Sequence, residues 1–449
     1  MAESHKTSES ISALSHHFKN DSLDPPDVPD VPQIIPPDGG SIAWMTIAGA
    51  WMVQFCTFGY INAFDYYTRD FLSTFSPSDI SWIGSLQLFL MYAPGVFVGR
   101  AFDAGYFHYM EISGSILYIF SLFMLSLTQR DKYYQVFLAQ GLGMGLGLGL
   151  TFLPSLSIVS HHFRRRRALA MGIVVSGASC GGIVFPIMLN RLFQSPAISF
   201  ANGVRASAGL LGGLLVLANG LMRTRLPPKG RGAPLDWDAF ARVVCDAPYL
   251  WSIAGGVLCA FCPRAALDGL AEPSSPASAY SFPLFAVDHG VDVRITTYCL
   301  AILNAGSTAG RLLPTFLADR LGVYNMLVPS IFTAGAVLFG MFGATTSAGV
   351  IVVGLIFGFA SGAYVSLIPA LLVMLCTDLS ELGVRMGFAF SVVGAAMLTG
   401  TPISGALLGT GPLHWWRSIV FAGVCIVTGF ACMLVSRTLF AARRGSQHI

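Results

Sequence analysis

The sequence contains little charge. Only 11% of its 449 residues are Asp, Glu, Lys or Arg, whereas 54% are hydrophobic. Because soluble domains carry about 25% charged residues, this composition excludes a water-soluble enzyme of this length. The net charge is only +3 and no basic tract alternates with aromatic residues, so no nucleic acid is expected as a partner.

Motifs of metal sites and of ATP-driven proteins are missing as well. The nine cysteines lack the spacing of a zinc site, and the lone C-x-x-C of Cys259 and Cys262 lies at the end of an apolar run. Neither H-E-x-x-H nor the phosphate-binding motif G-x-x-x-x-G-K-[ST] occurs. We therefore expect no enzyme, no ATP-driven pump, no metal and no cofactor.

Long apolar runs dominate the sequence instead. A membrane-spanning helix needs about 20 mostly apolar residues. By this measure twelve runs are predicted to be spans: 43–64, 80–101, 111–128, 134–156, 167–190, 206–222, 249–262, 294–317, 326–344, 347–372, 383–408 and 415–437. The chain is thus predicted to be an all-α membrane protein with twelve transmembrane helices in two six-helix bundles.

The polar segments complete the predicted domain organisation. Residues 1–42 form a polar tail, predicted to be disordered and without a cleavable signal peptide, before the bundle 43–222. A linker, 223–248, leads to the second bundle, 249–437, and to a short tail, 438–449.

The distribution of basic residues predicts the orientation in the membrane. Seventeen of the 26 basic residues fall on the side of the N-terminus and eight on the other side. The positive-inside rule therefore places both termini in the cytoplasm. No organelle-targeting signal is recognised, so the plasma membrane is the expected location.

The two halves of the chain repeat one another. Gly141, Gly145 and Gly149 match Gly354, Gly358 and Gly362; Asp103 matches Asp319; and Arg167 with Met171-Gly172 matches Arg385 with Met386-Gly387. The glycine, Asp and Met-Gly pairs lie 213 (354 − 141), 216 (319 − 103) and 215 (386 − 171) residues apart. This nearly constant offset indicates a duplicated six-helix unit, which is the plan of major facilitator transporters.

Two motifs resemble one transporter family in particular. Asp38-Gly39-Gly40-x-x-Ala43-Trp44, before the first span, resembles the D-G-G/S-x-x-W motif of the monocarboxylate transporter family. The run from His162 to Gly172 resembles the second motif of that family, and Gly310-Arg311-Leu312-Leu313-Pro314 is similar to the eighth helix of its fungal branch. The resemblance extends from about Pro36 to Leu439. It implies secondary transport of a small organic, carboxylated solute across the lipid bilayer by alternating access.

Arg311 is the sharpest candidate for a binding residue. An Arg at the centre of a membrane helix costs roughly 2.5–3.5 kcal/mol on insertion scales, so it usually faces a cavity or a partner. The resemblance implies that it binds the carboxylate of the substrate. The alternatives are a pair with Asp319 or Asp103, or a side chain that reaches the cytoplasmic surface. Further residues that line the cavity or join helices are Asn62, Tyr92, Asn304 and Tyr364.

Two positions depart from the family pattern. Proton-coupled members have a Lys where this chain has Asn62, and an Asp where it has Ser307. Neither Asn nor Ser titrates, so the usual proton relay is missing and weak proton coupling is expected. Asp65 is either a substitute proton carrier or a solvated residue paired with Arg69.

The remaining motif residues are expected to serve structure and gating. Asp103 and Asp319 are predicted to cap helix ends and, with neighbouring Arg, to latch the cytoplasmic gate. Gly39 and Gly40 suit a tight turn, and Trp44 suits the headgroup region. The gating and structural candidates are Asp38, Gly39, Gly40, Trp44, Asp103, Arg167, Asp319 and Arg320.

Three functions are weighed. The leading one is a transporter of a small, carboxylated metabolite. Export of a secondary metabolite is a second possibility within transport. A non-transporting sensor on the same fold is a third, although only a short tail follows the last span.

The seventh span has an atypical sequence. Its apolar run, Tyr249–Cys262, corresponds to roughly 21 Å of helix, less than the ~30 Å hydrocarbon core. Residues 263–279 follow with charges and prolines, and removing them would join the run to Tyr280-Ser281. This stretch is either a true extracellular insertion or a retained intron, and we favour the intron.

Overall fold

The structure is a computed structural model that describes residues 36–447 with the exception of 37, 62–70, 73, 76, 196–197, 226–240, 242–243, 268–292, 345, 377–381 and 409–414. Every regular element in these ranges is a helix. The all-α fold predicted from the apolar runs is therefore confirmed.

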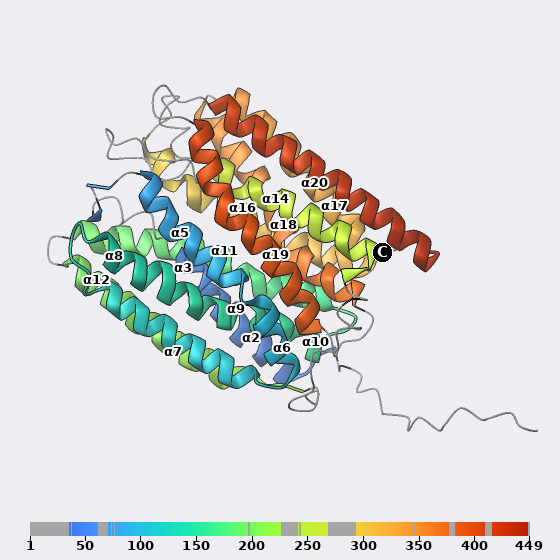
Figure 1. Ribbon diagram of the computed structural model, residues 1–449, viewed down its shortest axis with the longest axis horizontal. Coiled ribbons are helices and arrows are strands. Elements are labelled where there is room, and N and C mark those ends of the chain that lie inside the picture. The colour runs from blue at the N-terminus through green and yellow to red at the C-terminus, as the bar shows by residue number, and fades with distance from the viewer. Residues whose placement is uncertain are drawn as a thin grey trace, which may run out of the picture. The chain divides into compact units, whose positions relative to one another are not determined.

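The first six predicted spans correspond to the helices of the N-terminal half, drawn in blue to green in Figure 1. They are α2 (Ser41–Cys56) with α3 (Phe58–Ile61); α5 (Pro77–Tyr92) with α6 (Gly95–Asp103); α7 (Phe107–Leu125); α8 (Tyr133–Val136), the π-helix η1 (Phe137–Met144), α9 (Gly145–Ser157) and α10 (Val159–His162) in succession; α11 (Arg167–Gln194); and α12 (Phe200–Leu221). Pro94 separates α5 from α6, as expected for a residue without an amide hydrogen.

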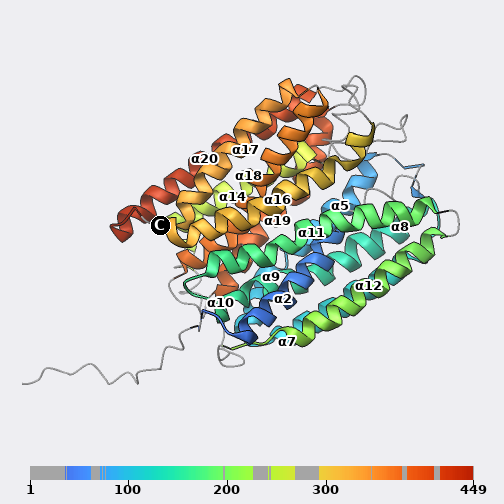
Figure 2. The same cartoon turned by 180° about the vertical axis from the view of Figure 1, so that it is seen from behind.

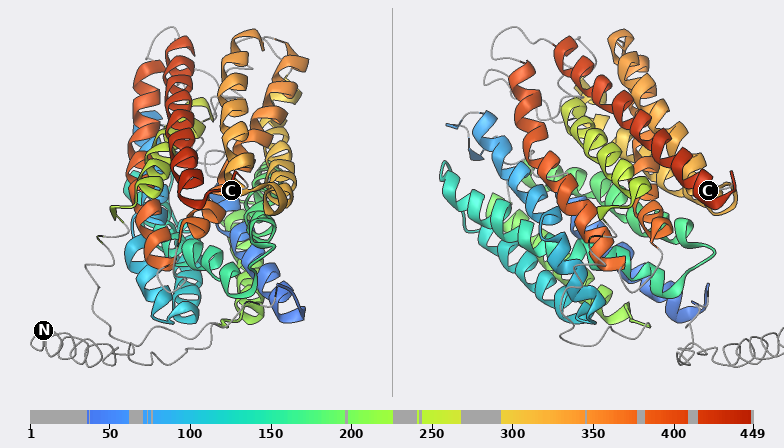
Figure 3. Two further views of the ribbon diagram at one scale, coloured as in Figure 1. Left: turned by 90° about the vertical axis from the view of Figure 1, so that its right-hand side faces the viewer. Right: turned by 45° about the vertical axis from the view of Figure 1, so that its right-hand side comes forward.

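The second six spans form the C-terminal half, seen from behind in yellow to red in Figure 2. They are α14 (Ala247–Leu267), α16 (Val293–Leu321), α17 (Val323–Gly340) with the short η2 (Met341–Gly343), α18 (Ser347–Leu375), α19 (Leu382–Leu408) and α20 (Trp415–Arg444). The last helix, α20, packs against α14 and α17 of its own half (Figure 3).

The helices fit a twelve-span fold in two bundles. Within the described ranges, ten helical stretches are long and apolar enough to cross a membrane. The other two predicted spans are α14, whose apolar part is Ala247–Phe261, and α16. α16 is the more polar of the two because one of its faces carries Asn304, Ser307, Arg311 and Thr315, all of which are buried.

Helix α14 is longer than its apolar run predicts. It continues through Pro263 to Leu267, so it has 21 residues and extends about 31 Å. That length is sufficient for a ~30 Å hydrocarbon core. Residues 268–292 lie outside the described ranges, so the insertion at 263–279 stays a prediction.

Glycines end the second and eighth spans in the same way. Gly105 follows Asp103 with φ 87°, and Gly322 follows Asp319 with φ 100°. A residue with a β-carbon rarely adopts this left-handed conformation, so glycine is required where each helix turns into the next. This requirement explains the Asp/Gly pattern that the two halves share.

The glycine ladders allow close packing of helices within each half. A β-carbon on Gly145 would lie 3.1 Å from Cα of Gln87 on α5. On α18, Gly358 and Gly362 contact the backbones of Leu303 and Ser307 on α16. The ladders are therefore packing contacts between the second and fourth spans of each half.

The two halves meet along two pairs of helices. α6 packs against α19, and α11 packs against α16. At the first contact, Gly95 and Gly99 lie directly against the backbones of Gly387 and Gly383. These pairs join the second span of one half to the fifth of the other, and they position the residues described next.

Candidate functional site

Arg311 is buried at the contact between the halves. Its side chain is on α16, the residue is only 6% exposed, and one Nη atom donates to the carbonyl oxygen of Val175 on α11. Its Nε has no hydrogen-bond partner, and it forms no ion pair with any carboxylate of the described residues. The carboxylates of Asp319 and Asp103 accept hydrogen bonds from other groups, so neither alternative pair is present.

Among the described residues, no carboxylate interacts electrostatically with Arg311. The groups that interact with it electrostatically are Tyr92 and Cys180. A phenol and a thiol are uncharged at neutral pH. A buried guanidinium without a carboxylate among the described residues is suited to binding an anion, because its planar fork matches a carboxylate with two hydrogen bonds.

A polar strip extends from Arg311 along α16. The hydroxyl of Ser179 on α11 donates to that of Ser307 at 3.1 Å. Two turns before Arg311, the amide of Asn304 donates to the carbonyl oxygens of Leu300 at 3.0 Å and Gly182 at 3.5 Å. Asn304 and Arg311 thus lie on one face of α16, toward α11.

Tyr92 brings an aromatic cluster to the same contact. Its ring stacks on Phe390 of α19 with centroids 5.6 Å apart and meets Phe152 of α9 edge-on at 5.2 Å. Phe152 and Phe390 also contact each other at 5.7 Å. A positive group and an aromatic surface therefore occur together where the halves meet.

Of the other two predicted binding residues, only Tyr364 is among the described residues. The hydroxyl of Tyr364 on α18 donates to the carbonyl oxygen of Gly256 on α14 at 3.3 Å. This contact joins two helices of the C-terminal half. Asn62, like Asp65, lies outside the described residues.

Asp103 and Asp319 each cap a helix of the opposite half. Asp319, at the end of α16, accepts from the backbone N–H groups of Ala168 and Leu169 at 2.9 and 3.0 Å. Asp103, at the end of α6, accepts from those of Gly383 and Val384 at 3.0 and 3.1 Å. Carboxylates stabilise helix N-termini because the first N–H groups lack partners and the helix dipole is positive there.

These caps revise one of the matched pairs. Because Ala168 and Gly383 occupy equivalent positions, the offset is 215 (383 − 168), and Arg167 then corresponds to Leu382 rather than to Arg385. The Nε of Arg167 donates to the carbonyl oxygen of Phe163 at 3.2 Å. Arg320 lies over the ring of Phe316, 5.0 Å from its centroid.

The opening motif binds the loop before α11. Asp38, with φ 56°, accepts from the backbone N–H groups of Arg164 and Arg165 at 2.5 and 2.6 Å. The ring of Trp44 packs edge-on against Phe163 at 5.2 Å while 41% of the residue stays exposed. Gly40 precedes α2 with φ 99°, and Gly39 is extended at φ 159°.

The sequence reasoning missed a related contact in the second half. Asp246 lies just before α14 and forms ion pairs with Arg385 of α19 at 3.7 Å and with Arg443 of α20 at 3.1 Å. Asp38 holds a similar position, before the first helix of its half and bound to the start of the fifth. The separation of 208 residues (246 − 38), close to the other offsets, is the signal that would have revealed it.

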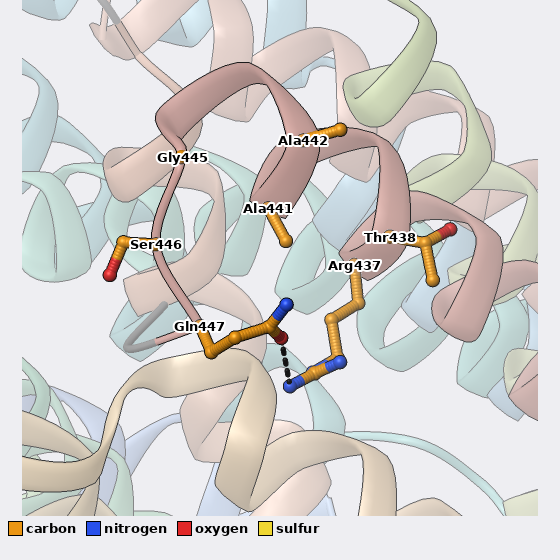
Figure 4. A pocket seen from close by; sticks show the side chains of 7 residues that line it. All are labelled: Arg437, Thr438, Ala441, Ala442, Gly445, Ser446 and Gln447. Carbon is orange, nitrogen blue, oxygen red and sulfur yellow. Dashed lines mark hydrogen bonds between the residues drawn. The ribbon is translucent and has the colours of Figure 1, made fainter.

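A pocket of about 360 Å³ lies elsewhere, at the C-terminal end of α20 (Figure 4). Arg437 crosses it, donating to Oδ1 of Asn325 at 2.9 and 3.0 Å and to Oε1 of Gln447 at 3.3 Å. The pocket contains none of the predicted site residues. Its polar groups join the C-terminal segment to α17.

Comparison with known sequences identifies relatives along most of the chain. The family model described as Major Facilitator Superfamily matches residues 46–342. The aspyridones efflux protein apdF of Emericella nidulans is 36% identical over 405 residues, covering 89% of this chain and 78% of the relative. MFS-type transporter 1 of Ophiocordyceps sp. is 34% identical (89% and 86% covered), and the fujikurins efflux protein of Gibberella fujikuroi is 35% identical (91% and 85%).

Solved structures with the same fold are more distant in sequence. The E. coli fucose:proton symporter FucP superposes with a TM-score of 0.65 at 15% identity, covering 87% of this chain and 98% of that one. The human organic anion transporter TETRAN gives 0.67 at 12% identity with the same coverage. At these identities the similarity concerns the fold alone.

Proposed function

The chain belongs to the major facilitator superfamily, and we propose that this multi-pass membrane transporter exports a small acidic metabolite. The cargo is bound between the two halves and released on the other side when the halves change their contact. Proteins of this family and fold are generally not enzymes, so the binding of a solute, rather than its conversion, is the activity to be explained.

The observation that carries the proposal is the buried Arg311. Its positive charge lies on a helix at the contact between the halves, has no ion-pair partner among the described residues and is close to Tyr92. An anionic group on the cargo supplies the missing negative charge, and the aromatic rings around Tyr92 accommodate an apolar body. The resemblance of the opening motif to monocarboxylate carriers favours a carboxylate as that group.

The direction of transport is proposed from the relatives. Two of them are named as efflux proteins, for aspyridones and for fujikurins. Each is more than 30% identical to this chain over most of both sequences. Outward transport of a secondary metabolite, which the sequence suggested as an alternative, is therefore our preferred form of the function.

The proposed transport cycle breaks and remakes the two cross-half caps. With the basic loops in the cytoplasm, Asp103 and Asp319 hold the halves together at the cytoplasmic end. Opening toward the cytoplasm requires both carboxylates to leave the helix N-termini of α19 and α11. In this scheme the protein lies in the plasma membrane, with the bundles 43–222 and 249–437 as the moving parts.

Metabolite profiling of the culture medium tests the proposal. Cells that lack the protein are expected to retain at least one acidic metabolite that wild-type cells secrete, and re-expression restores the secretion. Arg311→Gln at equal membrane abundance is expected not to restore it, whereas Arg191→Gln, which changes an exposed Arg, restores it fully. Identical profiles with and without the protein contradict export.

A further inference from the structure

Glu111 is a buried carboxyl group that the proposed transport cycle does not use. It lies on α7, one turn inside the start of the helix, and it is 0% exposed. Neither Oε1 nor Oε2 has a hydrogen-bond partner in the described part of the chain. An ionised carboxylate in such a place loses its hydration without compensation, which strongly disfavours the charged form.

Neighbouring residues on the same face of α7 show what surrounds this carboxyl. Gly114 packs against Thr151 and Leu150 of α9. The hydroxyl of Ser115, one turn after Glu111, accepts from the amide of Asn219 on α12 at 3.1 Å. Glu111 therefore lies inside the N-terminal bundle, between α9 and α12, and not against lipid.

Among the described residues, no Lys, Arg or His side chain, including His108 one turn earlier on α7, forms an ion pair with Glu111. The helices α9 and η1 contain no titratable residue, and α2 contributes only Cys56. On α12, Arg205 binds Ser126 at the far end of α7; beyond that helix, Arg223 is exposed and interacts with His108. On α7, Tyr109 is exposed and the hydroxyl of Tyr118 donates to the carbonyl oxygen of Cys56. On α6, Arg100 is exposed and Asp103 caps α19.

Two buried amide oxygens of the N-terminal bundle also lack a donor among the described residues. Oδ1 of Asn219 on α12 and Oε1 of Gln54 on α2 are both buried without a partner. The amide nitrogen of Gln54 is already used, since it donates to Ser155 at 3.0 Å. A carboxylic acid has an O–H to donate whereas a carboxylate has none, so this environment suits the neutral form.

We propose that Glu111 is a proton-binding site, which carries its proton in this conformation and releases it to water only when the packing of α7 against α9 and α12 opens. The step is a simple acid–base reaction without any redox partner: one O–H bond of a hydronium ion breaks, an O–H bond to a carboxylate oxygen forms, and a water molecule is left. This conformation binds the proton more tightly than one in which Glu111 reaches water. Lowering the pH therefore stabilises this conformation, and raising the pH destabilises it. The site rests on the proposed function and extends it by naming the proton as a coupling ion, which departs from the weak coupling expected from Asn62 and Ser307.

Infrared spectroscopy of the full-length protein in lipid vesicles tests the proton site without any cargo. The carbonyl band of a neutral carboxylic acid is expected to persist in the wild type at pH 7 to 8 and to be lost in Glu111→Gln. Asp79→Asn, which changes an exposed carboxyl, is expected to leave the band unchanged. If Glu111→Gln does not fold, Glu111→Asp keeps the carboxyl and is expected to shift the band.

Three outcomes overturn the proposal: a wild-type spectrum without the band, a band of full size in Glu111→Gln, or a band that Glu111→Asp neither shifts nor weakens. Because the probe is the proton itself, a negative result here does not depend on whether the export function is correct. Conversely, a failure to find an exported metabolite leaves the infrared result standing.

Discussion

Among single residues, Arg311 matters most, because its guanidinium group is the proposed binding site for the anionic cargo. The sequence identified this residue because a charge inside an apolar run is costly unless it has a function or a partner. The structure adds that its surroundings include the carbonyl oxygen of Val175 and the neutral side chains of Cys180 on α11 and Tyr92 on α5. Its position at the contact between the halves, together with its burial, is the reason why we propose that it binds the cargo.

Arg311→Lys is expected to reduce transport of the native solute at least about tenfold while membrane abundance stays normal. The ammonium group keeps the charge but cannot form two parallel hydrogen bonds to one carboxylate, and a hydrogen bond to a charged group contributes about 1.5–3 kcal/mol. Initial rates of transport in cells expressing equal amounts of each variant measure the effect. Wild-type rates in Arg311→Lys show that only charge matters at this position.

Two features could not be predicted from the sequence, the burial of Glu111 and the partner of Asp103, and each has its own physical cause. The apolar run of the third span was placed at 111–128, which put Glu111 at the membrane edge, whereas α7 begins one turn earlier, at Phe107. Hydropathy detects long apolar runs but not the exact end of a helix. The contacts of Asp103 with residues 280 positions away were likewise beyond reach, because no local pattern specifies which distant helix a carboxylate will cap.

At the scale of helices, the two cross-half caps are the clearest consequence of the internal duplication. The repeat offset of Asp103 and Asp319 predicted equivalent roles from the sequence. The observed geometry specifies the partner, since each carboxylate binds the N-terminus of the fifth helix in the opposite half. These bonds exist only while the halves are together at this end, so they favour one conformation over others.

Asp103→Ala and Asp319→Ala are each expected to destabilise the closed arrangement of this end, which the basic residues predict to be cytoplasmic, by about 0.5–2 kcal/mol, the range measured for lost N-terminal caps. The double variant is expected to show a larger shift than either single one. Protease accessibility of the cytoplasmic end in membrane vesicles, relative to Asp79→Asn, reports the shift. Equal accessibility in all variants contradicts a latch.

Helix α14 gives a prediction at the level of the gene. Its helical backbone continues to Leu267, although its uninterrupted apolar run ends at Cys262. If the codons for 263–279 belong to a retained intron, sequencing of the transcript is expected to show a message that joins Phe261-Cys262 to Tyr280-Ser281. A message and a mature protein that both contain this stretch establish it as a true insertion.

At the scale of the whole molecule, the chain is a transporter built from two related bundles. The twelve spans were predictable because apolar length and repeat spacing are properties of the sequence itself. The way in which the bundles meet was not predictable, because it depends on the close approach of α6 to α19 and of α11 to α16. The orientation in the membrane stays a prediction from the basic residues.

Epitope tags test that orientation. A tag in the N-terminal tail and another in the linker 223–248 are both expected to be inaccessible to antibody in intact cells and accessible after permeabilisation. The physical reason is the excess of basic residues on that side of the membrane. A tag at 409–414, between α19 and α20, is the matched control and is expected to be accessible from outside. Labelling of the linker in intact cells contradicts the topology.

The most direct test of the central claim is the flux of an exported acidic metabolite across vesicles that contain the purified protein. If Arg311 binds the anionic cargo, we expect a saturable flux for the wild type and for Arg191→Gln. We expect little or no protein-dependent flux for Arg311→Gln, because the anion loses its charged partner between the halves. A full rate in Arg311→Gln, or a flux equal to that of protein-free vesicles in the wild type, contradicts it.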